Sequence, residues 1–152
     1  MKDYEKVAEN VYMKWIEGFN FENKKYTQVS GYIFDNDNNM VIVKSENWTI
    51  PGGHPEKGET PLETLNREVM EEACITIKDI KYLGAVEVVE NGNTYYQLRY
   101  TAHVDEILPF KKEWEVSARE FVSLSNLQDY IAWANGKSFI NQIESAKIVW
   151  NI

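Results

Sequence analysis

The chain has 152 residues, 43% of them hydrophobic and 13% aromatic, so it can fill the core of one domain, which we expect to span residues 1–152. Its formal net charge of −8 argues against a polymeric nucleic acid as partner, because such binding draws on clustered Lys and Arg. The single cysteine excludes an intramolecular disulfide. No apolar run approaches the length of a membrane span and the start MKDYEKVAEN lacks the pattern of a signal peptide, so we expect a cytoplasmic protein without a membrane partner.

Residues 3–17 are predicted to form a helix. Apolar and aromatic side chains recur there at three- and four-residue steps: Tyr4, Val7, Ala8, Val11, Tyr12, Trp15, Ile16 and Phe19. We therefore expect residues 1–20 to form an N-terminal helical extension packed on the sheet or on a second subunit. The aromatic character of this helix suggests a homodimer.

A β-hairpin is predicted next. Residues 28–34 and 40–44 are rich in aliphatic and β-branched side chains, and the polar run from Asp35 to Asn39 separates them. Such a run is typical of a turn between two strands.

A second helix is predicted to begin near Pro61. Thr60 can cap it, and Glu63, three residues after the cap, completes a capping box. One stripe of this helix is apolar and is expected to face the core: Leu62, Leu65, Val69 and Ala73.

Three carboxylates gather beside that stripe. Glu68, Glu71 and Glu72 fall within about a 100° arc of the helix. Like charges at these spacings repel by a few tenths of a kcal/mol per pair unless a cation lies among them. Mg²⁺ binds carboxylates together with substrate phosphates, so the patch indicates a metal site for a phosphate ester or anhydride. An ordinary solvated acidic face is the alternative, and the cluster by itself does not decide between them.

The wider stretch from Gly53 to Ile75, GHPEKGETPLETLNREVMEEACI, resembles the Nudix box, GX5EX7REUXEEXGU with U aliphatic. The matching positions are Gly53, Glu59, Arg67, Glu68, Val69, Glu71, Glu72 and Ile75. Cys74 departs from the pattern, because the family usually has glycine at this exit from the helix. It implies either about 1 kcal/mol of strain or a different exit turn, and no metal ligand is lost. We expect Cys74 to be a small buried apolar group rather than a reactive thiol.

The resemblance implies an α/β fold, the Nudix-type α/β/α sandwich with a mixed sheet. Elements after the box agree with it. Residues 80–90 and 94–104 flank an Asn-Gly pair and are predicted to form a second hairpin. A strand is expected over 120–124, a short helix over 126–134 and a closing amphipathic helix over 138–150.

The resemblance also implies a function, the hydrolysis of a pyrophosphate linkage in a nucleoside diphosphate joined to another group. Water would attack phosphorus with the help of Mg²⁺ or Mn²⁺. Glu71 and Glu72 then correspond to metal ligands, and Glu68 to a further ligand or the base that activates water. Arg67 orients these carboxylates, and Glu59 is its structural partner. The small-molecule substrate, a nucleoside triphosphate, a nucleotide sugar or another derivative, stays open because no subgroup signature is present.

The loop before the helix supplies further candidates. Gly52 and Gly53 allow the backbone to approach a phosphate closely, and the Gly53 backbone is a candidate metal ligand. His54 lies in the same loop and is a candidate for substrate contact.

Candidates beyond the box are an additional acid and the stacking aromatics. Glu113 or Glu115 precedes a predicted strand, from which it could reach the metal, although either is also typical of a solvated carboxylate. Trp48, Tyr96 and Trp114 could stack on a nucleobase or simply pack within the fold.

Two functions of other classes keep the same fold. A Nudix-fold module could bind a nucleotide without cleaving it, but such a binder has no need for the full set of box residues. An isoprenoid diphosphate isomerase needs a cysteine and an acid outside the box, whereas Cys74 lies inside it. The sequence therefore favours the hydrolase.

Overall fold

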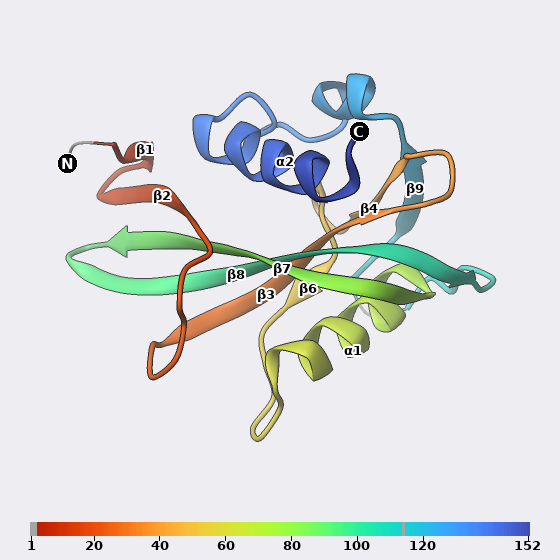
Figure 1. Cartoon of the computed structure of the whole chain (residues 1–152), viewed down its shortest axis with the longest axis horizontal. Coiled ribbons are helices and arrows are strands. Elements are labelled where there is room, and N and C mark those ends of the chain that lie inside the picture. The colour runs from red at the N-terminus through yellow and green to blue at the C-terminus, as the bar shows by residue number, and fades with distance from the viewer. Residues whose placement is uncertain (1–2, 114) are drawn as a thin grey trace.

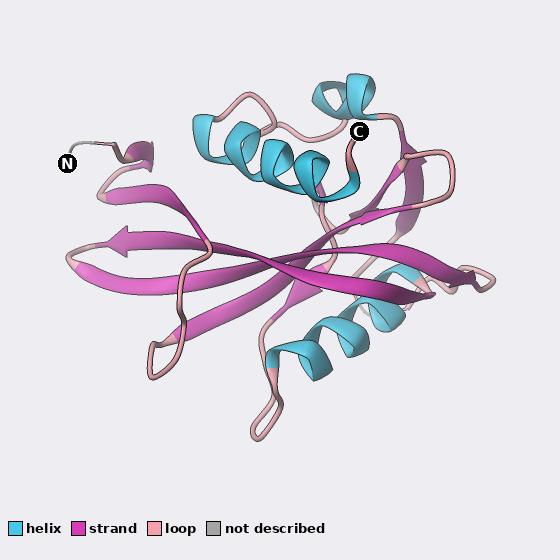
Figure 2. Cartoon of the chain, viewed as in Figure 1, coloured by secondary structure: helices cyan, strands magenta, loops and turns pink. Residues whose placement is uncertain are grey.

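A computed structural model describes residues 3–113 and 115–152 of the chain. Within these residues a mixed sheet of nine strands separates α1 from α2, which cover its opposite faces (Figure 1, Figure 2). The predicted α/β/α sandwich is confirmed. The elements are β1 (Glu5–Ala8), β2 (Val11–Glu17), β3 (Tyr26–Phe34), β4 (Met40–Lys44), β5 (Trp48–Thr49), β6 (Gly52–Gly53), α1 (Pro61–Ala73), β7 (Ile75–Glu90), β8 (Asn93–Ile107), β9 (Ala118–Val122), a 3-10 helix (Leu124–Asp129) and α2 (Lys137–Trp150).

The strands follow the order β1-β2-β7-β8-β3-β4-β5, while β6 pairs with β3 and β9 with β4. Only the pair of β3 and β8 is parallel among the described strands, and all other pairs are antiparallel. Side chains alternate between the faces of a strand. On β3, Val29 and Ile33 accordingly join the core beneath α1, whereas Tyr32 and Phe34 join the core beneath α2.

Both predicted hairpins are present. At the β3–β4 turn, the Asp35 carboxylate accepts the backbone N–H groups of Asp37 and Asn39, each at 2.9 Å. At the β7–β8 turn, Asn91 and Gly92 take the positive φ values of 51° and 82° that a tight hairpin turn requires. β7 and β8 extend further than predicted, because register shifts between Thr76 and Gly84 let a twisted pair continue to the end of α1.

The N-terminal segment is a correction. The helix predicted over 3–17 is wrong, because this segment forms the antiparallel strands β1 and β2. The helical extension expected over 1–20 is therefore wrong for residues 3–20, and residues 1–2 lie outside the described residues. β2 pairs along its whole length with residues Gly84–Glu90 of β7, so pairing with a distant strand overrides a local helical period. The suggested homodimer depended on that helix, and it stays a prediction without this support.

The C-terminal elements agree with the sequence in kind. The strand expected over 120–124 is β9, and the closing helix is α2. The short helix expected over 126–134 is instead a 3-10 turn that ends at Asp129, although Leu127, Ile131 and Ala134 still fill the core beneath α2. No helix in the described part of the chain is long and apolar enough to cross a membrane.

Candidate active site

The start of α1 forms as the sequence predicts. The Thr60 hydroxyl accepts the Glu63 N–H at 3.2 Å, and the Glu63 carboxylate accepts the Thr60 N–H at 3.0 Å, so the capping box is complete. The buried stripe differs at one position. Leu62 is 46% exposed, and Thr64 is buried in its place. The Thr64 hydroxyl donates to Glu59 at 3.0 Å, so the buried face of α1 includes this polar contact.

Arg67 is the centre of the box. Its Nε and Nη2 donate to the two oxygens of Glu59 at 2.7 and 2.9 Å, a bidentate pair. These hydrogen bonds from Arg67 are the main reason that the pKa of Glu59 falls to about 2. The Arg67 Nη1 donates to Glu68 at 2.8 Å and to Glu71 at 3.2 Å. One guanidinium therefore fixes three carboxylates of the motif.

The fourth box carboxylate, Glu72, is held from the loop. The backbone N–H of Gly52 donates to Glu72 Oε1 at 2.8 Å. Burial is the main cause that raises the pKa of Glu72 to about 7, and the negative charges of Glu68, Glu71 and Glu115 raise it further. Burial also raises the pKa of Glu68. The carboxylates thus lie in one shared negative field.

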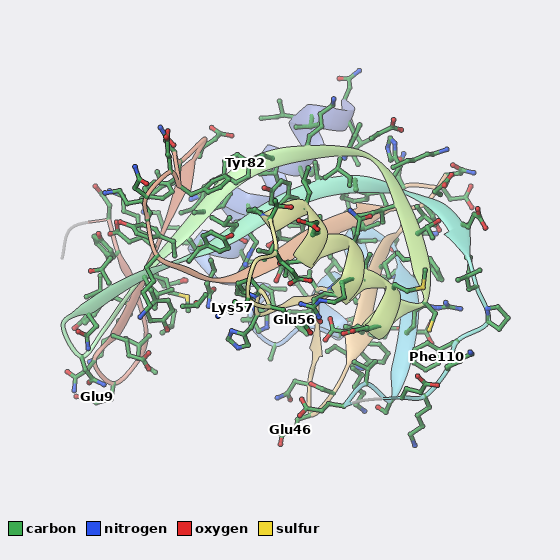
Figure 3. The ribbon with its side chains drawn as sticks, turned by 90° about the horizontal axis from the view of Figure 1, so that it is seen from below. Glu9, Glu46, Glu56, Lys57, Tyr82 and Phe110 are labelled. Carbon is green, nitrogen blue, oxygen red and sulfur yellow. The ribbon has the colours of Figure 1, made fainter. Side chains whose placement is uncertain are left out.

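The two glycines of the loop allow strand and helix to approach closely. β6 pairs with β3, and a Cβ on Gly52 would lie 2.4 Å from the Val29 carbonyl oxygen. A Cβ on Gly53 would lie 2.6 Å from the Glu68 carboxyl carbon. A side chain at either position would therefore displace β3 or Glu68. In Figure 3, which views the α1 side, Glu56 and Lys57 lie in the loop that runs from these glycines to the helix.

The donor set suits a hard cation, although it is not a finished cage. Among residues 3–113 and 115–152, no three His, Cys, Asp or Glu side chains converge as a preformed metal site. Arg67 binds one oxygen of Glu68 and one of Glu71, and the Gly52 N–H binds one oxygen of Glu72. The second oxygen of each accepts no hydrogen bond within the described residues. Mg²⁺ or Mn²⁺ would bind such oxygens and would offset the repulsion between these partly buried negative charges.

Cys74 ends α1 in the left-handed region. Its φ and ψ are 54° and 47°, so the exit turn is the one that glycine favours and the strained alternative holds. The side chain is 7% exposed, which confirms the expected buried apolar group. Arg119 completes this end, since its Nη1 donates to the carbonyls of Ala73 at 2.8 Å and Leu108 at 2.9 Å. No pattern in the sequence indicated this role.

The two distal acids line different hollows. Glu113 lines a hollow of about 390 Å³ together with Glu71. Glu115 lines an open hollow of about 820 Å³ with Trp48 and contributes to the raised pKa of Glu72. Both are exposed.

The aromatic candidates Trp48 and Tyr96 have different surroundings. Trp48 meets Tyr130 edge to face, with ring centroids 5.4 Å apart, and borders the open hollow. Tyr96 instead stacks on Phe19 at 4.3 Å and donates its hydroxyl to Glu87 at 3.1 Å, which is a packing arrangement. Trp114 lies outside the described residues.

His54 is exposed and its ring Nδ1 lies 2.6 Å from the carbonyl oxygen of Thr27. Its own backbone carbonyl accepts the Arg67 Nη2 at 3.0 Å. The loop conformation is therefore tied to the guanidinium that arranges the carboxylates.

One buried cation was not anticipated at all. Arg99 is 7% exposed at the centre of β8, between Leu98 and Tyr100, and points to the α2 face of the sheet with Gln142. A charged residue within an apolar strand was the available signal, but its partners lie far away in the sequence.

Comparison with known proteins gives the family. The NUDIX domain model matches residues 24–143. The chain is similar to the ADP-ribose pyrophosphatase of Methanocaldococcus jannaschii, with 27% identity over 122 residues, 68% of this chain and 72% of the relative.

Two solved structures share the fold. One is a mutant of the Bacillus subtilis pyrophosphohydrolase BsRppH, with a TM-score of 0.81 and 16% identity over 96% of each chain. The other is the NUDIX domain of Shewanella oneidensis NrtR complexed with ADP ribose, with a TM-score of 0.65 and 17% identity over 88% of this chain and 94% of that one. Because the family model covers most of the sequence and the box residues converge around Arg67, the chain belongs to the Nudix hydrolase family.

Proposed function

We propose that this protein hydrolyses the pyrophosphate linkage of a small nucleotide derivative in a reaction that depends on Mg²⁺ or Mn²⁺. The observation that carries the proposal is the arrangement of Glu68, Glu71 and Glu72. Each has one oxygen fixed by Arg67 or by the Gly52 N–H, and the second oxygen of each accepts no hydrogen bond from the residues that the structure describes. Such preorganised oxygens suit metal ions that act on a phosphate anhydride.

The residues take distinct roles in this proposal. Glu71 and Glu72 hold the metal, with the Gly53 backbone as a further ligand, and Glu68 serves as an additional ligand or as the base that takes a proton from water. Arg67 positions these groups and does not touch the substrate. When bound, the metal neutralises charge that develops on the pyrophosphate and lowers the pKa of coordinated water.

The distal acid is assigned to Glu115 rather than Glu113. Its negative charge acts on Glu72, and it shares the open hollow with Trp48. Trp48, which borders that hollow, and His54, in the glycine loop, are the residues proposed to contact the substrate. Tyr96 stays with its packing partner Phe19.

The names of the relatives support the reaction class. A pyrophosphohydrolase and an ADP-ribose pyrophosphatase both act on linked phosphates. The NrtR domain is described in complex with ADP ribose, which keeps nucleotide binding without cleavage as the competing function. Many turnovers per protein molecule separate the two, because a binder shows only ligand-dependent stabilisation.

The test is the release of phosphate and nucleotide from nucleoside triphosphates, nucleotide sugars, dinucleoside polyphosphates and ADP-ribose with Mg²⁺ or Mn²⁺. Glu72→Gln should lower kcat on the order of a hundredfold or more, since metal stabilisation of charge is worth several kcal/mol. Glu144→Gln, an exposed carboxylate on α2, is the matched control and should retain activity. Equal activity of Glu72→Gln and the wild type would contradict the assignment.

A further inference from the structure

A second concave site lies on the α2 face of the sheet, opposite α1. It is a hollow of about 350 Å³, within the size range of small-molecule pockets. Arg99, Gln28 and Gln97 form its floor on β8 and β3. Glu5, Trp133 and Phe139 stand on its walls.

The floor is rich in hydrogen-bond donors. Arg99 donates from Nη1 to Gln28 Oε1 at 3.1 Å and from Nη2 to Gln97 Oε1 at 3.1 Å. It also donates to Gln142 Oε1 at 3.0 Å and to the Leu98 carbonyl at 3.3 Å. All four acceptors are neutral, and a guanidinium carries five N–H groups, so one N–H keeps no acceptor within the described residues.

The orientation of the glutamines follows from Arg99. A guanidinium only donates, so the amide oxygens of Gln28 and Gln97 must face it and their NH₂ groups remain free. In the described part of the chain neither NH₂ group has an acceptor. The floor therefore offers N–H groups from three side chains.

The walls supply a hydrogen-bond acceptor and two aromatic rings. Glu5 Oε2 accepts the N–H of Lys137 at 2.8 Å, and Oε1 has no donor among the described residues. Trp133 is 41% exposed although its ring packs edge to face on Phe139, with centroids 4.7 Å apart. A flat ligand placed here would cover this exposed ring and stack on it.

The hollow is close to the catalytic loop. Gln28 and Ser30 lie on the same face of β3, and Ser30 pairs with Gly52, whose N–H binds Glu72. Two residues along a strand span ~7 Å, about the length of a sugar phosphate. Thr49, on the strand that leads into the loop, also lines the hollow. The two sites thus meet at the Ser30–Gly52 pair, and a nucleotide that joins them would pass over this pair from the α2 face to Glu72.

We propose that this hollow binds the nucleobase of the substrate and selects guanine. The inference rests on the proposed function. Guanine presents two adjacent acceptors, O6 and N7, to the donors of Arg99, Gln28 and Gln97, whereas adenine places an N6 amino group there. The N1–H and N2 amino group of guanine are donors, and Glu5 is the acceptor for them.

The Glu5 wall belongs to the N-terminal hairpin. Glu5, Val7 and Met13 all line the hollow, and all precede residue 24, where the match to the family domain begins. Base selection here thus uses a segment that lies outside the match to the family model. Truncation of this hairpin should weaken base preference, although β2 also completes the sheet.

The test compares kcat/KM for GTP, ITP and ATP. The wild type should prefer GTP and ITP to ATP by about ten- to a hundredfold, the range that matched polar contacts to a base give. Gln97→Met removes one floor donor and should reduce this preference. Glu5→Gln should reduce the preference for GTP over ITP, because ITP lacks the N2 amino group. Gln128→Met, an exposed glutamine outside the hollow, should leave both ratios unchanged.

Binding of GMP and AMP in EDTA separates failure of this inference from failure of the proposed function. Tighter binding of GMP that weakens in Gln97→Met supports the guanine site even if no triphosphate is cleaved. Equal binding of the two, or a preference for AMP, overturns the inference even if hydrolysis is efficient. Unchanged GTP to ATP and GTP to ITP ratios in Gln97→Met and Glu5→Gln also overturn it.

Discussion

Glu72→Gln should stabilise the metal-free protein at alkaline pH. In the folded state burial raises the pKa of Glu72 from 4.5 to about 7. At ~1.4 kcal/mol for each pKa unit, this rise corresponds to about 3 kcal/mol. The folded state holds the proton more tightly than the unfolded state, so the contribution of Glu72 is fully present below pH 4.5 and is lost as pH rises through 7. Glutamine mimics the protonated form and can still accept the Gly52 N–H.

The measurement is urea unfolding followed by tryptophan fluorescence, in EDTA, at pH 5 and pH 8. We expect the free energy of unfolding of Glu72→Gln to exceed that of the wild type by up to about 3 kcal/mol at pH 8 and by little at pH 5. Other titrating groups cancel in this difference. Glu144→Gln should show no such dependence on pH. Saturating Mg²⁺ should then stabilise the wild type and not Glu72→Gln, because only the wild type retains the full ligand set.

A Glu72→Gln variant that is equally stable or less stable than the wild type at pH 8 would refute this reasoning. It would mean that the ionised carboxylate is already compensated without a metal. The buried charge of Glu72 would then not destabilise the metal-free protein, and it would give no support to a cation site.

Three further predictions concern the frame around the site. Arg119→Met should lower the free energy of unfolding by about 2 kcal/mol, since charged hydrogen bonds to the end of α1 are lost; an unchanged urea midpoint would contradict this. Glu59→Gln should make the free energy of unfolding fall less steeply as pH is lowered from 4.5 toward 2. The pKa of Glu59 is lowered to about 2 in the folded wild type, so the stability that its ionised form contributes is lost over this pH range, whereas glutamine does not titrate. Gly52→Ala should lower both stability and kcat, since its Cβ would lie 2.4 Å from the Val29 carbonyl oxygen; wild-type values in both assays would argue against that approach.

The helix of the box could be predicted because its signals are local. The capping residues Thr60 and Glu63 lie within one turn of each other and fix the start of α1 without help from the rest of the chain. The two hairpins were predictable for the same reason, because a short polar turn sets each pairing.

The N-terminal segment shows where local information ends. Its apolar residues fit a helical period, yet Val11, Met13 and Trp15 also alternate as in a strand. Pairing with β7, more than 60 residues further along the chain, decides between the two. The register of such a distant partner is not contained in the segment itself.

The candidate site likewise has a part that local sequence predicts and a part that it does not. The residues of the box follow from their spacing on one helix and one loop. Arg99 and Arg119 could not be assigned, because their acceptors come from elements that lie far apart in the sequence. The hollow that joins Glu5 to Trp133 likewise exists only once the N-terminal hairpin folds against the start of α2.

The most direct test of the central claim is hydrolysis in ¹⁸O-labelled water with Mg²⁺, with EDTA, and after Mg²⁺ is restored. We expect many turnovers per protein molecule that stop in EDTA and resume with metal, and one ¹⁸O atom in a phosphate of the product. Binding without turnover across the substrate panel, or turnover that persists in EDTA, would contradict a metal-dependent attack of water on phosphorus.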